Sequence, residues 1–272
     1  MRCALATFIL VAVATSAAAA EVLDVGEGDT ALSAVLYRPA GAGPFPVAVG
    51  LHDCAGMLST NGQILRRFAD WGERLSKQGI AVLFVDSFTR RGLGSQCGVR
   101  ERKVRSFRER VADAYAARRW LQNQGWAVKN RVSLLGWSNG AAGSLWAVRP
   151  RLMPRDGMPD FRSVVAFYPS CRRLSAAAWS ARVPTLILTG RADDWTPAAT
   201  CEQMVDGAKG RSAQASIIVY PGAYHEFDRP DYPVRMITGL ANSADGTGRA
   251  HVGTNPAARS DAISRVTEWL RR

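Results

Sequence analysis

Short apolar runs recur along the chain, and longer amphipathic stretches separate them. Each run is rich in Val, Ile, Leu, Ala and Phe and ends at Gly or a polar residue, the pattern of strands buried on both faces of a parallel sheet. A further run at 34–39 ends in Pro39 and predicts an edge strand. The alternation with helical stretches predicts an α/β protein with a mostly parallel, doubly wound sheet. The buried strands are expected at 47–51, 80–85, 132–135, 163–168, 184–189 and 216–220.

Helices are expected at about 61–78, 102–124, 197–209 and 257–270. The second of them overlaps a dense basic run, residues 100–111. Val104, Phe107 and Val111 of this run recur at helical spacing, which Tyr115 just beyond it continues. We interpret the charges of this run as a solvated helix face. Only about fifteen residues separate the runs 163–168 and 184–189, where proteins of this architecture often insert a lid. No large lid is therefore expected.

The first twenty residues differ from the rest of the chain. Arg2 is followed by an apolar run from Ala4 to Ala14 and then by small residues ending at Ala20, which predicts a secretory signal cleaved near Ala20. The apolar run is short for a membrane span, although a retained anchor is the alternative. The remaining 21–272 are expected to form a single domain, because no linker, repeat or low-complexity run interrupts them. We therefore predict a secreted or periplasmic protein without stable membrane insertion.

Four cysteines remain after the signal: Cys54, Cys97, Cys171 and Cys201. In an exported protein they predict two disulfides, for which three pairings exist. Cys54 and Cys97 follow neighbouring predicted strands, as do Cys171 and Cys201, so we favour these two pairs. Four buried thiols are the alternative. The spacing is not that of a metal site, and no metal or organic cofactor is expected.

The chain carries a formal net charge of +12. Such a balance usually suggests nucleic-acid binding, but the predicted export and the absence of any recognition motif argue against it. The basic run at 100–111, interpreted above as a solvated helix face, could alternatively attract an anionic substrate or an anionic envelope surface.

The run at 132–135 leads into Gly136-Trp137-Ser138-Asn139-Gly140, and small residues follow. This is the G-x-S-x-G pattern of a nucleophile elbow, in which a sharp turn between strand and helix presents the serine. Gly136 and Gly140 permit the close approach of strand and helix that a β-carbon would prevent. Ser138 is thus the predicted nucleophile, and the N–H of Asn139 lies where a developing oxyanion is stabilised.

A serine hydroxyl needs a general base, and in this arrangement the acid and then the histidine follow the serine in the sequence. His225 comes directly after the strand at 216–220 and is preferred to His251, which lies in a polar stretch further on. The acid is expected after the strand at 184–189, where Asp193 and Asp194 are adjacent and one of them is a candidate cap for the next helix. A second oxyanion donor is expected near Cys54. His52 is expected to shape that loop or to cap the strand.

Several segments together resemble the dienelactone hydrolase family of the α/β-hydrolase superfamily. They cover essentially the whole mature chain: His52–Gly56, Asp86-Ser87-Phe88, Gly136–Gly140, Gly190–Pro197, Tyr220–Phe227 and His251–Ala258. The resemblance implies an α/β-hydrolase fold and favours Asp193, which precedes Pro197 by four positions. It also implies an oxyanion hole formed by the N–H groups of Cys54 and Asn139.

The resemblance also implies a substrate site. The founding enzymes of the family hold the carboxylate of a dienelactone substrate with two arginines, which correspond here to Arg90 or Arg91 and to Arg229. A planar guanidinium suits bidentate carboxylate binding. The sequence departs from the founding enzymes by placing Ser138 where they have cysteine. Export also separates it from them.

These features predict an exported serine hydrolase that cleaves carboxylic esters or lactones through an acyl-enzyme, with a small-molecule substrate and no nucleic-acid partner. A peptidase related to the prolyl oligopeptidases is one alternative, although the chain has no room for a propeller or a large lid. A non-catalytic exported binding protein on the same fold is the other.

Overall fold

The computed structural model describes residues 20–28 and 31–272. The predicted signal segment, up to Ala20, lies outside the described residues except for Ala20 itself. Among the helices of the described part, none is long and apolar enough to cross a membrane.

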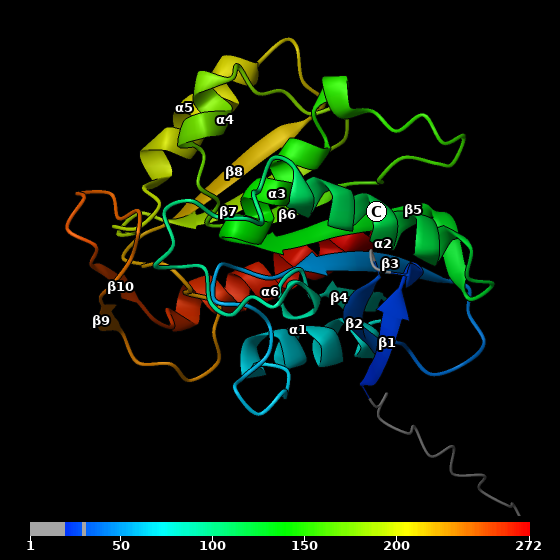
Figure 1. Cartoon of the computed structure of the whole chain (residues 1–272). Helices are drawn as coiled ribbons and strands as arrows, with labels where there is room; N and C mark the ends of the chain where they lie inside the picture. Colours follow the sequence, from blue (N-terminus) through cyan, green and yellow to red (C-terminus); the bar gives the residue numbers. More distant parts are fainter. Residues whose placement is uncertain (1–19, 29–30) are drawn as a thin grey trace, which may run out of the picture.

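An eight-stranded sheet runs through the centre of the molecule in the order β1-β2-β4-β3-β5-β6-β7-β8 (Figure 1). The strands from β4 to β8 are parallel to one another, whereas β1 and β2 pair antiparallel at one side. The sheet is mostly parallel, as the apolar runs predict. Its strands are β1 (Glu21–Val25), β2 (Leu32–Tyr37), β3 (Phe45–Leu51), β4 (Ala81–Val85), β5 (Ala127–Trp137), β6 (Val164–Phe167), β7 (Thr185–Gly190) and β8 (Ala215–Tyr220).

The prediction of an edge strand at 34–39 was wrong in position. β2 pairs with β4 on one side and with β1 on the other, so β1 is the edge. β1 lacks an apolar run because four of its five residues are exposed or half-buried, and so no sequence signal marks it.

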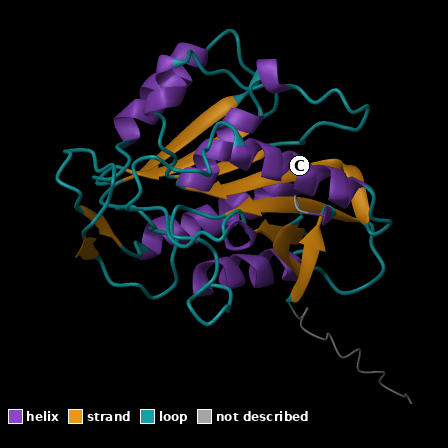
Figure 2. Cartoon of the chain, in the orientation of Figure 1, coloured by secondary structure: helices purple, strands orange, loops and turns teal. Residues whose placement is uncertain are grey.

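Helices cover both faces of the sheet (Figures 1 and 2). The first face is covered by α2 (Glu109–Gln122), α3 (Asn139–Ala147), α4 (Arg172–Ala176) and α5 (Ala198–Ala208), and the second by α1 (Arg66–Lys77) and α6 (Pro256–Arg271). Two buried apolar layers result, and burial of these side chains supplies the main driving force for the fold. This is the doubly wound architecture expected from the alternation of strands and helices.

Two predicted helices begin later than expected. Residues before α1 form a turn in which Ser59 N donates to Gln63 O at 2.8 Å, and Leu58 bridges Ile64. The basic run is helical only from Glu109, and Val104 before it is buried in the preceding turns. Its interpretation as a solvated helix face therefore fails for Arg110, which is fully buried.

Only α4 lies between β6 and β7, so no large lid is inserted there. The segment between β8 and α6 instead carries a small hairpin, β9 (Arg235–Ile237) and β10 (Ala250–Val252). Leu240, Ala250 and Val252 of this segment pack against Cys54 and Trp195, forming a third apolar cluster separate from the two layers.

Two disulfides fasten loops at the carboxyl edge of the sheet. Cys54 after β3 is bonded to Cys97, and Cys171 after β6 is bonded to Cys201 in α5. These are the two pairs that the order of the predicted strands favours.

Candidate active site

Ser138 stands between β5 and α3 in a strained backbone conformation, with φ 48° and ψ −110°. The flanking glycines explain how the chain turns so sharply. A β-carbon at Gly136 would lie 2.7 Å from the backbone nitrogen of Ala141, and one at Gly140 would collide with the carbonyl of Leu51. The turn at Ser138 is thus packed closely against the end of β3, where the loop to Cys54 begins.

The side chains of Ser138, His225 and Asp193 form a continuous hydrogen-bonded series. His225 Nε2 lies 3.0 Å from Ser138 Oγ, and His225 Nδ1 lies 2.8 Å from Asp193 Oδ2. The exposed fractions are 6% for Ser138, 1% for His225 and 3% for Asp193. Because Nδ1 faces a carboxylate, it carries the proton and leaves the Nε2 lone pair directed at the serine hydroxyl.

Asp193 is held by its own loop. Its Oδ1 accepts hydrogen bonds from the N–H groups of Trp195 at 2.9 Å and Thr196 at 2.8 Å. The hydroxyl of Thr196 lies 3.0 Å from Asp193 Oδ2 and 3.1 Å from His225 Nδ1. Thr196 was not singled out from the sequence, although it lies in the Asp193–Pro197 segment whose spacing favours Asp193.

Asp194 has a different partner. Its Oδ2 lies 2.7 Å from His251 Nδ1, and its Oδ1 accepts from the backbone N–H of His251 at 2.8 Å. Neither aspartate caps α5, whose N-cap residue is Pro197. The two adjacent carboxylates therefore bind the two histidines that follow the serine in the sequence.

Aromatic side chains fix the imidazole of His225. The ring centroid of Tyr168 lies 4.4 Å from that of His225, and the centroid of Trp195 lies 4.6 Å away. On the backbone, Gly253 N donates to His225 O at 3.0 Å, which ties the histidine loop to the chain after β10. Packing on several sides leaves the ring little freedom to leave the serine.

The loop after β3, residues 52–54, adjoins the elbow and is held at each of its three positions. Arg110 Nη2 donates to the carbonyl of His52, and Asp53 pairs with Arg67. The third residue, Cys54, is fixed by its disulfide, and its carbonyl accepts from Gln96 N at 2.7 Å. Asn139 begins α3, and the first N–H groups of a helix have no partner within it.

His52 is neutral and structural. Its Nε2 faces the N–H of Ser87 at 3.1 Å and Arg110 Nη1 at 3.0 Å, so its Nδ1 donates to Asp53 O at 2.7 Å. Burial, with the nearby Arg110 guanidinium, holds the pKa of His52 well below its usual value. This accords with the expectation that His52 shapes the loop.

A buried cluster of polar side chains joins the loop after β3 to the loop that carries His225. We call it the Arg67 cluster: Arg67, Asp53, Glu226 and Tyr168. Although burial opposes ionisation, the guanidinium groups of Arg67 and Arg229 lower the pKa of Glu226 to about 2. This cluster could not be predicted from the sequence, because an arginine in an amphipathic helix is usually solvated.

The model of the dienelactone hydrolase family matches residues 32–272, nearly the whole chain. The chain belongs to the dienelactone hydrolase family. Membership assigns it to the carboxylic ester hydrolases and agrees with the resemblance carried by the elbow and the loops around it. No protein with a curated description matches the chain.

Solved structures of this family and of esterases share the fold. A dienelactone hydrolase structure from Klebsiella pneumoniae is 20% identical, with a TM-score of 0.68, 94% of this chain covered and 100% of the other. One from Anabaena variabilis is 18% identical, with a TM-score of 0.64 and coverages of 94% and 98%. Esterase 2 of Thermogutta terrifontis is 18% identical, with a TM-score of 0.65 and coverages of 93% and 94%.

The arginines that the family resemblance suggests for substrate binding are engaged with acidic side chains. Arg90 pairs with Asp24 at 2.5 Å, and Arg91 pairs with Asp113 at 2.6 Å. Arg229 pairs with Glu226 at 2.7 Å, and its guanidinium lies 3.6 Å from the ring centroid of Tyr232. A substrate carboxylate would therefore compete with these internal partners.

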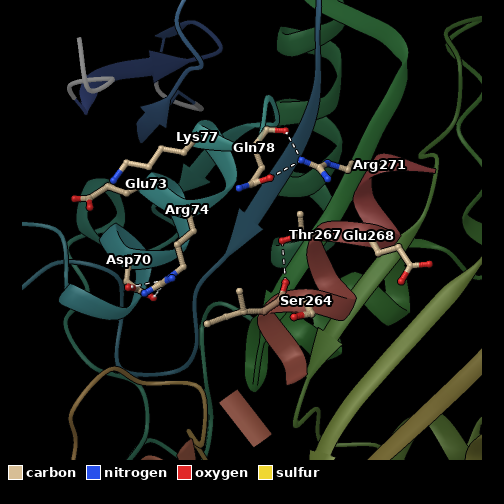
Figure 3. A pocket seen from close by; sticks show the side chains of 10 residues that line it. Asp70, Glu73, Arg74, Lys77, Gln78, Ser264, Thr267, Glu268 and Arg271 are labelled. Atoms are coloured by element: carbon tan, nitrogen blue, oxygen red, sulfur yellow. Dashed lines mark hydrogen bonds and ion pairs between the residues drawn. The ribbon is translucent and has the colours of Figure 1, made fainter. Parts of the chain in front are cut away.

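Two of the pockets in the described part of the chain differ in the elements that line them. One of about 390 Å³ is lined by Ala55–Thr60 after Cys54 and by residues after β4, including Phe88 and Leu93. A larger one, of about 520 Å³, lies between α1 and α6 (Figure 3). Its charged lining is partly paired within itself, as in Arg74 with Asp70 at 3.0 Å, and it contains none of the three hydrogen-bonded residues of the site.

Proposed function

We propose that this member of the dienelactone hydrolase family hydrolyses small carboxylic esters or lactones through an acyl-enzyme on Ser138. The observation that carries the proposal is the continuous series from Asp193 to His225 to Ser138, with separations of 2.8 and 3.0 Å. A buried serine beside an oriented imidazole is the arrangement that nucleophilic acyl transfer requires.

In the proposed reaction, His225 Nε2 removes the proton from Ser138 Oγ as the oxygen attacks the substrate carbonyl. The N–H groups of Cys54 and Asn139 stabilise the resulting oxyanion. His225 then protonates the departing alcohol, which leaves the acyl group on Ser138. Water, deprotonated by the same nitrogen, attacks the acyl-enzyme, and the acid is released as Ser138 recovers its proton.

The surroundings support these roles. Two backbone N–H groups and the Thr196 hydroxyl donate to Asp193 and hold its carboxyl group in place, so it is suited to stabilising an imidazolium at His225. The loop after β3 is held at three consecutive residues, and rigid donors stabilise a developing charge without reorganisation.

Known proteins of this fold give the proposal chemical context. Esterase 2 of Thermogutta terrifontis has been solved with propionate bound and phosphorylated by paraoxon. A dienelactone hydrolase-like protein from metagenomic libraries, of TM-score 0.66, is described as a promiscuous phosphotriesterase. We therefore propose organophosphates as covalent probes of Ser138.

We further propose that residues 21–272 act as one exported domain. The two disulfides accord with an oxidising compartment, where such bonds persist.

The test is hydrolysis of a panel of short p-nitrophenyl esters and one carboxylate-bearing lactone by wild type, Ser138→Ala and His225→Ala. We expect kcat of both variants to fall by about 10⁴ or more, because the nucleophile and its base act as a unit. Arg90→Gln and Arg229→Gln test the role of these arginines in substrate binding. A loss of turnover confined to the carboxylate-bearing lactone would assign them to the substrate carboxylate. Equal turnover by wild type and Ser138→Ala would rule out the proposed function.

A further inference from the structure

Arg67 lies in the first turn of α1, on the opposite face of the sheet from α3, yet its side chain is only 4% exposed. Its guanidinium contacts three polar groups. Nη2 donates to Asp53 Oδ2, Nη1 donates to the hydroxyl of Tyr168 at 3.1 Å, and Nη1 lies 3.4 Å from Glu226 Oε1. One buried cation thus joins three segments far apart in the sequence.

Each of these three partners adjoins a proposed reacting group. Asp53 immediately precedes Cys54, and Glu226 immediately follows His225. Tyr168 follows β6, and its ring lies against the imidazole of His225. The guanidinium therefore links the loop of the proposed oxyanion donor to the loop of the proposed base, and its polar partners are Asp53, Tyr168 and Glu226, not the three residues of the hydrogen-bonded series.

The charges in this cluster make the arginine necessary. Asp53 and Glu226 are both buried, and two carboxylates at close range repel each other unless a cation lies between them. Glu226 has a second partner in Arg229, at 2.7 Å, whereas the other oxygen of Asp53 accepts, among the residues that the structure describes, only from Ala55 N, at 2.8 Å. Replacement of Arg67 would therefore affect mainly Asp53, which would lose its cationic partner, and through Asp53 it would affect the position of the Cys54 loop.

We propose that Arg67 is a positioning residue that fixes the oxyanion loop relative to the histidine loop. This inference rests on the proposed function. Charge stabilisation in the transition state depends on donor placement to within a fraction of an ångström, whereas binding of a small ester does not. Arg67 therefore acts on turnover more than on substrate binding.

The experiment compares Arg67→Gln and Arg67→Lys with Arg66→Gln, each assayed with p-nitrophenyl acetate. Arg66 is the matched control, because it is the neighbouring arginine of α1, is largely exposed and pairs with the exposed Asp231 at 2.7 Å. We expect kcat of Arg67→Gln to fall by about ten- to a hundredfold, with KM within about threefold of wild type. Arg67→Lys should recover part of the loss, and Arg66→Gln should match wild type.

A double variant separates positioning from general instability. Asp53→Asn removes the buried charge and keeps an acceptor for Ala55 N, so Arg67→Gln/Asp53→Asn should lose less turnover than Arg67→Gln alone. Circular dichroism and titration of active serines with a fluorophosphonate give the folded, competent fraction of each variant. The value of kcat per labelled site is the deciding quantity.

Two results would overturn the inference. One is a kcat per labelled site for Arg67→Gln within about twofold of Arg66→Gln, and the other is a loss confined to KM. Wild type without Ser138-dependent turnover would instead reject the proposed function, and this inference with it. An active wild type with unaffected Arg67 variants rejects this inference alone.

Discussion

Asp193 and Asp194 are neighbours in the sequence, yet they bind different histidines. Asp193 contacts His225 at 2.8 Å, and Asp194 contacts His251 at 2.7 Å. We expect Asp193→Asn to lower kcat by about 10³–10⁴, because an amide no longer stabilises the imidazolium or fixes the tautomer. Asp194→Asn, the matched control, should stay within a few-fold of wild type. Pre-steady-state acylation by p-nitrophenyl acetate compares the two variants. Equal losses of activity in Asp193→Asn and Asp194→Asn would contradict the assignment.

Single functional residues can be predicted from the sequence where a residue type and its local spacing carry the signal. Ser138 stands in a five-residue pattern, and His225 directly follows a strong apolar run. Arg67 and Arg110 could not be recognised in this way, because a buried arginine depends on partners far away in the sequence. The contact between Asp194 and His251 likewise forms only when β10 folds beside the loop of His225.

The two disulfides at the carboxyl edge of the sheet hold different segments: Cys54–Cys97 holds the loop after β3, and Cys171–Cys201 ties the segment after β6 to α5. Removing Cys54–Cys97 by replacing both residues with Ala should destabilise the protein by about 3–4 kcal/mol through chain entropy. It should also lower kcat, because the loop of Cys54 loses its covalent hold. The paired replacement at Cys171 and Cys201 should give a comparable loss of stability with kcat largely retained. Urea unfolding and ester hydrolysis of both double variants test this contrast.

The apolar runs predicted most strands, since a strand buried on both faces shows a pattern that depends on few long-range contacts. The residues at which helices begin were harder to predict from the sequence. The turn before α1 and the segment before α2 are fixed by side-chain and backbone contacts, such as that of Arg105 N with Glu109 Oε2 at 2.9 Å. β1 escaped prediction because an exposed edge strand needs no apolar run.

Across the whole molecule, folding stability should depend on pH through His52. Its folded pKa lies below the unfolded value of 6.5, so the unfolded chain binds a proton that the folded chain does not. Stability is therefore fully present above about pH 6.5 and is lost as the pH falls below it. We expect Tm to fall by a few degrees between pH 7 and pH 5. His52→Gln should unfold at lower temperature but with a shallower pH slope, and an unchanged slope would contradict this cause.

The overall architecture follows from the sequence because α/β alternation leaves few topologies open. The elbow then defines the edge of the sheet at which the other proposed reacting groups are expected to lie. What long-range packing adds is the rigidity of that edge, from Arg67, Arg110 and the disulfide of Cys54.

If the chain is exported as proposed, the bond between Cys54 and Cys97 forms only after it has left the reducing compartment in which it is synthesised. A newly made chain in a reducing cytoplasm carries both thiols free, and its loop after β3 is then held by Arg67 and Arg110 without the covalent tie. Under the proposed export, full hydrolytic activity is expected only after oxidation, when the chain no longer meets the esters of the cell that made it.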